Sequence, residues 1–298
     1  MVITQDGRER PVQELGHGDH ACLAFADDGE QRRVVTAYLS EGLARGERVQ
    51  YFAERQDPAT VLGWLRSVGT DVDAAASRGQ LQVATADDGY LASGRFDAET
   101  MVATLQQEVA DSLRAGYTGL RVSGEMSWGL RDVPGADQLA EYEAKVNELF
   151  AGQPATAVCQ YDARLFSPDQ LRTFDRYHPG TVQAEALHSS ALLRIVPSFT
   201  EGQRTLRVVG SVDYRTTTAL AEALETTLQW PGDVCVDMSG LEFIDLAGLR
   251  VLAHTAEKFT PGRRLRVVEL TPMLCQVISV TGFDQQDALV VTPRGAAE

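Results

Sequence analysis

Hydrophobic residues in the first 179 positions recur in short runs, separated by longer segments with apolar side chains three and four residues apart. Short apolar runs are typical of strands buried on both faces, and the longer spacing is typical of helices packed on one side. This alternation predicts an α/β domain with a doubly wound, mostly parallel sheet. The expected strands are 20–25, 48–53, 81–83, 119–123 and 156–161, and the expected helices are 31–45, one opening at 57–58, 97–115, 136–150 and 167–177.

The last third of the chain has a different, more compact pattern. We expect strands at 191–196, 205–209, 233–237 and 265–269 and helices at 214–228, 247–259 and 273–281, which together make a smaller mixed α/β domain. Residues 180–190 follow the helix-stopping His178-Pro179-Gly180 and have little periodicity. The expected organisation is therefore one domain at 1–179, a linker at 180–190 and a second domain at 191–298.

Charge and composition exclude some classes of function. The formal net charge is -15, which gives the chain no electrostatic attraction to phosphate backbones, so direct binding to nucleic acid is not expected. No apolar stretch reaches the roughly 20 residues that cross a bilayer, and no signal-peptide pattern opens the chain. The four cysteines are far apart in sequence and form no CxxC pair, as expected for reduced thiols in a cytoplasmic protein.

The segment from Asp237 to Leu249 is the most informative motif. It reads Asp-Met-Ser-Gly-Leu-Glu-Phe-Ile-Asp-Leu-Ala-Gly-Leu and joins an apolar strand to an amphipathic helix. With Gly210-Ser211-Val212-Asp213 and the following Thr216, it resembles the STAS domains of anti-sigma-factor antagonists. In switchable members of that family, a Ser or Thr after the loop Asp is phosphorylated. Here Leu246 follows Asp245, so the resemblance implies a phospho-switch scaffold without its hydroxyl.

Two interpretations of Leu246 remain open at this stage: an exposed apolar contact for a partner, or a core residue of the helix stripe. Asp245 is expected to cap the helix, contact a partner, or both. Ser239 lies on the strand side of the loop and not at the switch position. The resemblance implies a partner-binding loop, which we expect to contain Asp213, Ser239, Asp245, Leu246, Ala247 and Gly248.

The first half resembles the MEDS sensory domains found in bacterial signalling proteins. The resemblance rests on Gly18-Asp19-His20-Ala21-Cys22-Leu23 and on the α/β alternation that follows. It implies a fold related to the RecA/KaiC ATPase core. The first strand–helix junction, residues 26–33, has one glycine, no lysine and two adjacent aspartates, so a phosphate loop is not expected there.

Candidate ligand-binding residues in this half are few. If a small ligand binds, His20, Cys22, Glu125 and Trp128 are the side chains that we expect near it. A buried histidine, a free thiol and ordinary core packing are the simpler explanation of His20, Cys22 and Trp128. His17, with His20 and Cys22, could supply nitrogen and sulfur ligands to a metal or haem, but a fourth ligand is not evident. We therefore predict no metal, no cofactor and no catalytic residue.

The sequence as a whole predicts a non-enzymatic bacterial signalling regulator. Its first domain would sense a small ligand or a partner and would transmit its state across 180–190. Its STAS domain would contact an anti-sigma factor or a related switch-protein kinase and regulate transcription indirectly. Two alternatives remain: a degenerate nucleotide-binding domain with residual ATP binding, and a homo-oligomeric scaffold like the STAS proteins of stressosomes.

Overall fold

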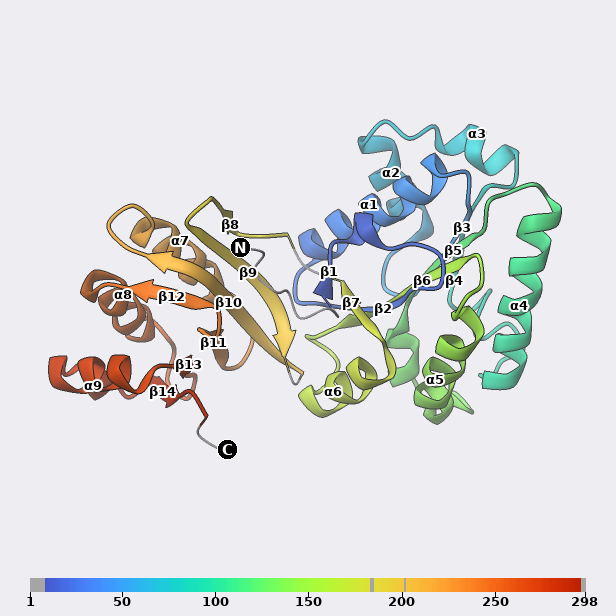
Figure 1. The fold of residues 1–298 in the computed structure, drawn as a ribbon. Coiled ribbons are helices and arrows are strands. Elements are labelled where there is room, and N and C mark those ends of the chain that lie inside the picture. Colours follow the sequence, from blue (N-terminus) through green and yellow to red (C-terminus); the bar gives the residue numbers. More distant parts are fainter. Residues whose placement is uncertain (1–8, 183–184, 201, 296–298) are drawn as a thin grey trace. The chain divides into compact units, whose positions relative to one another are not determined.

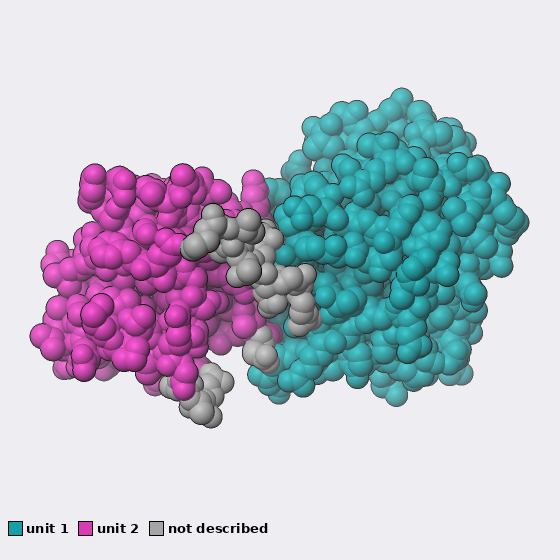
Figure 2. Space-filling model, viewed as in Figure 1, with its two compact units in different colours: residues 1–183 teal, residues 184–298 magenta. Residues whose placement is uncertain are grey.

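The computed structural model describes residues 9–182, 185–200 and 202–295. The chain divides into two compact units, residues 1–183 and 184–298 (Figure 2). Each unit has its own buried apolar core, so we describe the two units separately.

The first unit is built on a seven-stranded, entirely parallel sheet (Figure 1). Its spatial order is β1-β7-β2-β6-β5-β3-β4, so the first long strand lies between two of the last. The five predicted strands are present, and two short strands are added at one edge. The bounds are β1 Glu9–Arg10, β2 His20–Phe25, β3 Arg48–Ala53, β4 Leu81–Thr85, β5 Leu120–Glu125, β6 Ala155–Asp162 and β7 Gly180–Val182.

Helices cover both faces of this sheet, and this confirms the predicted doubly wound arrangement. The helices α1, α2 and α3 pack together in one layer, and α4, α5 and α6 in another (Figure 1). Chain direction along the sheet reverses after β4, which is why the second set of crossovers lies on the opposite face. The bounds are α1 Asp28–Ala44, α2 Pro58–Ser67, α3 Val72–Ser77, α4 Ala98–Arg114, α5 Leu139–Phe150 and α6 Pro168–Tyr177.

Local sequence explains where these helices begin. Asp57 accepts a hydrogen bond from the Ala59 backbone N–H, and Pro58 occupies the first helical position of α2, as predicted. Ser167 and Gln170 form a reciprocal capping box at the start of α6. The short 3-10 turns at 12–14, 126–130 and 136–138 complete the unit.

The second unit has a mixed sheet in the order β14-β13-β11-β10-β9-β8, with β12 paired to β10. The hairpin β9–β10 is antiparallel, and β11 to β14 run parallel to their neighbours. This confirms a mixed α/β domain, to which β8, β12 and β14 are additions. The bounds are β8 His188–Ser189, β9 Leu193–Thr200, β10 Gln203–Val212, β11 Val234–Asp237, β12 Leu241–Ile244, β13 Leu265–Leu270, β14 Leu289–Pro293, α7 Thr217–Thr227, α8 Leu246–Ala256 and α9 Pro272–Thr281, with a 3-10 turn at 283–285.

The segment expected to be a linker, 180–190, contributes a strand to each unit. Strand β7 pairs with β1 and β2 of the first sheet, and β8 pairs with β9 of the second. The division between the units falls after residue 183, within the predicted segment. Across the described residues, no helix has the length and apolar character that crossing a bilayer requires.

Candidate functional site

The loop that precedes α8 is held by its own aspartate. Asp245 Oδ1 accepts a hydrogen bond of 2.9 Å from the Gly248 backbone N–H, so Asp245 is the N-cap of α8. The Asp245 backbone N–H in turn donates to the Val212 carbonyl at the end of β10, at 3.1 Å. A Cβ on Gly248 would lie 2.7 Å from Ile244 and 2.8 Å from Val212, so a glycine here lets the helix approach the sheet closely.

Leu246 is the first residue of α8, and its side chain is 47% exposed. Of the two interpretations from sequence, packing into the core is therefore wrong, and Leu246 is an exposed apolar side chain. Two further exposed apolar residues belong to neighbouring elements: Phe243 on β12 is 52% exposed and Met273 on α9 is 67% exposed. Phe243 and Met273 line one groove of about 170 Å³ between β12 and α9.

Other residues expected in the partner-binding loop occupy different places. Asp213 is bound to Arg215 at 2.6 Å, and this hydrogen-bonded pair holds the pKa of the Asp213 carboxyl below its ordinary value. Ala247 is exposed beside Leu246. Ser239 is exposed in the turn before β12, so the whole strand separates it from Leu246. Thr216 is buried and donates to the Ser211 carbonyl, which makes its hydroxyl part of the fold.

At the carboxyl edge of the first sheet, Glu125 organises a dense polar network. It accepts hydrogen bonds from the Tyr51 hydroxyl at 2.7 Å and from the backbone N–H of Arg55 at 2.6 Å. Nearby, Arg164 pairs with Asp162 at 2.7 Å and with Asp28 at 2.6 Å. The remaining cavity holds about 10 Å³, so these groups satisfy one another and leave no room for a nucleotide.

The junction between β2 and α1 has no phosphate loop. Only Ala26 and Asp27 separate the strand from the helix. The Asp27 carboxylate accepts from the Glu30 N–H at 2.8 Å, and the Glu30 carboxylate accepts from the Ala26 N–H at 3.1 Å. The chain's own carboxylates therefore occupy backbone donors that a phosphate would need at a helix N-terminus.

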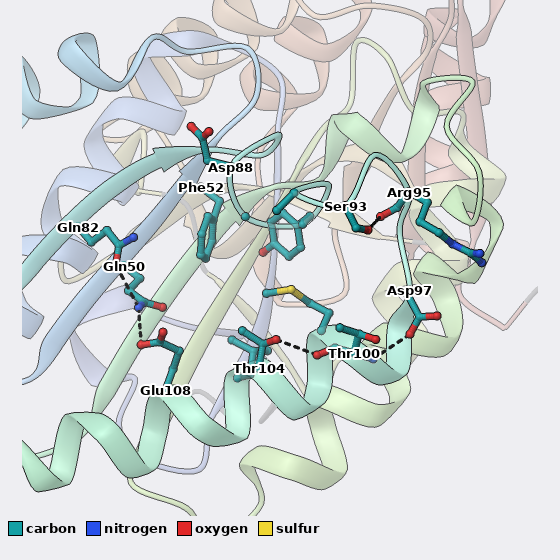
Figure 3. Close-up of a pocket in the computed structure, with 15 residues that line it drawn as sticks. Gln50, Phe52, Gln82, Asp88, Ser93, Arg95, Asp97, Thr100, Thr104 and Glu108 are labelled. Carbon is teal, nitrogen blue, oxygen red and sulfur yellow. Dashed lines mark hydrogen bonds between the residues drawn. The ribbon is translucent and has the colours of Figure 1, made fainter.

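A roomier cavity of the first unit lies between α4, strands β3 and β4 and the segment 88–97 (Figure 3). It has a volume of about 310 Å³, which is the lower end of the range for small-molecule pockets. Figure 3 shows Phe52 against the cavity, with a polar chain formed by Gln82, Gln50 and Glu108 at one end. Phe52, Tyr90, Met101 and Leu105 give it an apolar body, and Arg95 and Asp97 lie at its other end.

Of the four predicted ligand residues, none lines this cavity directly. Trp128 supports its wall, because its fully buried ring stacks on Tyr90 with centroids 5.3 Å apart. Tyr90 in turn lies over Gly124, where an added Cβ would come within 2.3 Å of the Tyr90 hydroxyl. The cavity residues were not predicted from sequence, because side chains spread from Gln50 to Glu108 form no recognisable motif.

His20 lies in a separate, fully buried cluster. Its Nε2 is 3.2 Å from Glu143 Oε2 and 3.3 Å from Cys159 Sγ, and His178 Nε2 is 3.3 Å from the same Glu143 oxygen. His17 is elsewhere, paired with Glu47 at 3.1 Å and partly exposed. Cys22 is buried on β2 opposite Cys159 on β6, outside the group of converging side chains.

Burial and mutual contacts shift the protonation of this cluster. Burial, and then the neighbouring His178, lower the pKa of His20 despite the opposing effect of Glu143. Burial alone would raise the pKa of Glu143, but contacts with His178 and His20 hold it well below its ordinary value. Burial raises the pKa of the Cys159 thiol. Sequence spacing could not have revealed Glu143, Cys159 and His178, because three different elements carry them.

Comparison with family models identifies both units. Residues 19–179 match the model described as MEDS: MEthanogen/methylotroph, DcmR Sensory domain. Residues 195–292 match the model described as Mlab, STAS domain. Both matches confirm the resemblances drawn from the motifs.

Individual relatives fall into the same two groups. The chain is 29% identical over 169 residues to the transcriptional repressor DcmR of Methylorubrum extorquens; the match covers 56% of this chain and 61% of that protein. It is 32% identical over 96 residues to the anti-sigma-F factor antagonist RsfB of Mycobacterium tuberculosis, covering 32% of this chain and 79% of RsfB. The chain thus spans about three fifths of the repressor's length.

Comparison with solved structures finds partial similarity to two proteins. An anti-sigma factor antagonist from Mycobacterium paratuberculosis is 27% identical, with a TM-score of 0.30, over 35% of this chain and 90% of that one. A KaiC-like protein from Pyrococcus horikoshii is 11% identical, with a TM-score of 0.42, over 64% of this chain and 89% of that one.

Proposed function

The chain belongs to the family of MEDS sensory domains and carries a STAS domain, which makes it a signalling regulator, and we propose that it acts without catalysis. The first unit binds a small molecule in the cavity of Figure 3. The second unit binds an anti-sigma factor or a related switch-protein kinase through the surface around Leu246. Ligand state reaches this surface through the segment 180–190.

The exposure of Leu246 is the observation that carries the proposal. An exposed leucine stands at the start of α8, where switchable relatives have the phosphorylated hydroxyl. The aspartate cap of the helix is intact, so the loop keeps a defined shape without the phosphate-accepting group. Phe243 extends the apolar surface on the adjacent strand. A leucine in this place favours a contact that phosphorylation does not switch off.

Binding of a purified anti-sigma kinase to the full chain tests this partner surface. Burying a leucine side chain contributes about 1.5–3 kcal/mol, so Leu246→Ala should weaken binding about 10- to 100-fold. Val280→Ala is the matched control, because Val280 is an exposed apolar residue of α9 that is outside the groove near Leu246. Equal affinities for the two variants, or no binding of any such kinase to the wild type, would refute the proposal.

Filling the cavity with a larger side chain tests whether the small molecule binds there. Thr104 faces the cavity from α4, and its hydroxyl bonds to the Thr100 carbonyl (Figure 3). Thr104→Trp should abolish the thermal stabilisation that a library of small organic metabolites produces in the wild type. Thr173→Trp is the control, because Thr173 is exposed on α6 and makes the same kind of bond, to the Asp169 carbonyl. Stabilisation that persists in Thr104→Trp would place the ligand elsewhere.

The partly polar lining of the cavity indicates the chemical class of ligand. A volume of about 310 Å³ suits a molecule much smaller than a nucleotide. Its apolar middle is bounded by two amides and Glu108 at one end and by Arg95 and Asp97 at the other. A short apolar molecule with one polar or anionic end fits these groups.

A further inference from the structure

Four side chains that suit metal binding converge inside the first unit. They are His20 of β2, Glu143 of α5, Cys159 of β6 and His178, which follows the last residue of α6. Their ligand atoms all lie within 4.8 Å of one another, and all four residues are buried. None of them lines the cavity of Figure 3, so the proposed small-molecule site leaves this cluster without a role.

Hydrogen bonds outside the cluster fix the orientation of both imidazoles. His178 Nδ1 lies 2.7 Å from the Phe174 carbonyl, so this nitrogen carries a proton. His20 Nδ1 lies 2.7 Å from Asn147 Oδ1, and Asn147 uses its NH₂ group to donate to the Tyr177 carbonyl. His20 Nδ1 is therefore the donor to Asn147. In the neutral form of each ring, Nε2 is left with a lone pair that points toward Glu143.

This arrangement brings electron-rich atoms together. Both Nε2 atoms approach one carboxylate oxygen, Glu143 Oε2, at 3.2 and 3.3 Å. The Cys159 thiol donates a hydrogen bond of 3.4 Å to that same oxygen. The other carboxylate oxygen accepts a hydrogen bond from the Tyr161 hydroxyl at 2.5 Å, so the carboxylate too is oriented from outside the cluster. A metal ion among these buried atoms would replace the proton that the Cys159 thiol donates to Glu143 and would pair the buried carboxylate charge.

Four of the six separations between ligand atoms match those of a tetrahedral metal centre, and all six lie within 4.8 Å. Zinc bonds nitrogen and oxygen at about 2.0–2.1 Å and sulfur at about 2.3 Å, which places neighbouring ligand atoms about 3.3–3.6 Å apart in a tetrahedron. The four separations given above for His20, Glu143, Cys159 and His178 run from 3.2 to 3.4 Å. Each imidazole also donates its other N–H to a protein acceptor, the usual second layer of bonds around metal-bound histidines.

We propose that His20, Glu143, Cys159 and His178 bind one divalent transition-metal ion, and that zinc fits this ligand set best. A thiolate and two imidazoles disfavour magnesium and calcium, which prefer oxygen. On binding, the Cys159 thiol loses its proton to solvent as the metal–sulfur bond forms. The carboxylate and thiolate then balance the two positive charges, so the buried centre is neutral.

The proposed site is structural. Four protein ligands close the coordination sphere, and their burial leaves no position for substrate or water. The ion would join two neighbouring strands to α5 and to the C-terminal end of α6, which lie on one face of the sheet. A metal ion at this site differs from the prediction made from sequence, which was that the protein binds no metal. The proposal is independent of the partner that the STAS unit binds.

Metal content of the full chain, purified without a metal-binding tag from zinc-supplemented medium, tests the proposal. We expect about one zinc per chain by inductively coupled plasma mass spectrometry. Protein produced with cobalt should show visible ligand-field bands and a thiolate charge-transfer band. Cys159→Ser should lose the charge-transfer band, whereas Cys22→Ser, which changes the neighbouring buried thiol, should keep it.

Two further variants separate metal binding from a general loss of folding. Asn147→Ala removes the partner of His20 and should weaken zinc binding about 10- to 100-fold in competition with a chromophoric chelator. His17→Gln should leave zinc binding unchanged, because His17 pairs with Glu47 outside the cluster. Folded wild type with less than about 0.1 metal per chain, both as purified and after refolding with zinc, would overturn the proposal. A charge-transfer band that persists in Cys159→Ser would overturn it as well.

Discussion

The pair formed by Arg121 and Glu47 should dominate the stability of the first unit. Both side chains are almost fully buried, and the guanidinium donates to the Glu47 carboxylate. It also lies 4.5 Å from the centre of the Tyr38 ring and bonds to the carbonyls of Tyr38 and Leu15. Glu47→Leu would leave the buried Arg121 charge without the carboxylate to which it donates, which costs about 3–5 kcal/mol.

This loss is a large fraction of the roughly 5–15 kcal/mol that stabilises a typical domain. With a urea dependence of about 2–3 kcal/mol per molar, it would lower the unfolding midpoint by about 1–2 M. Trp64 and Trp128 belong to the first unit and Trp230 to the second, so fluorescence in a Trp230→Phe background reports the first unit.

A double-mutant cycle measures how strongly Arg121 and Glu47 stabilise each other. Arg121→Met should also destabilise the unit, but Glu47→Leu combined with Arg121→Met should be more stable than the sum of the single losses predicts, because neither buried charge is then left alone. A loss below about 1 kcal/mol for Glu47→Leu, or a coupling energy below about 0.5 kcal/mol, would show that solvent reaches and screens the pair.

Three further predictions concern single positions. Gly124→Ala should destabilise the first unit by about 1–3 kcal/mol in urea unfolding, because the Tyr90 hydroxyl must move to make room for the new Cβ. Gly63→Ala is the control: the space around its new Cβ is open, so it should stabilise the unit by up to about 1 kcal/mol. Asp245→Ala should cost about 1 kcal/mol of the second unit's stability by removing the cap of α8, measured by Trp230 fluorescence; an unchanged midpoint would contradict the capping role. Because Arg215 lowers the pKa of the Asp213 carboxyl, the stabilisation from this pair is complete above the carboxyl's ordinary pKa of about 3.9 and is lost as pH falls through the lowered value; an NMR titration of Asp213 that gives an ordinary pKa would refute this.

The periodicity of apolar residues was enough to predict the architecture of both units, because those apolar positions form the buried cores. The strand 156–161 and the helix 97–115 were recognisable because one is continuously apolar and the other places Leu105 and Val109 on one buried face. Strand β12 was not predicted from sequence, because Glu242 and Phe243 are both exposed. Within the described residues, this strand pairs with β10 alone. Short strands such as β7 and β14 depend on pairing partners, which no local pattern records.

The candidate sites were less predictable than the fold. The STAS loop was recognised from contiguous residues, since Asp245 and Gly248 cap and seat one helix. His20 was noticed for its proximity in sequence to Cys22, but its contacts in space come from Glu143 and Cys159. Strand pairing between β2 and β6 brings these groups together, and that pairing joins positions more than a hundred residues apart.

The position of β2 in the sheet also bears on how the chain folds during synthesis. This strand leaves the ribosome before β3 to β7, and its neighbours β6 and β7 are the last strands of the first unit. Until they appear, the apolar sequence His-Ala-Cys-Leu-Ala-Phe has no strand to pair with on either side. Nascent chains that stop before β6 should therefore expose an aggregation-prone edge and depend on chaperones, whereas chains that extend past β7 can close the sheet before the second unit is complete.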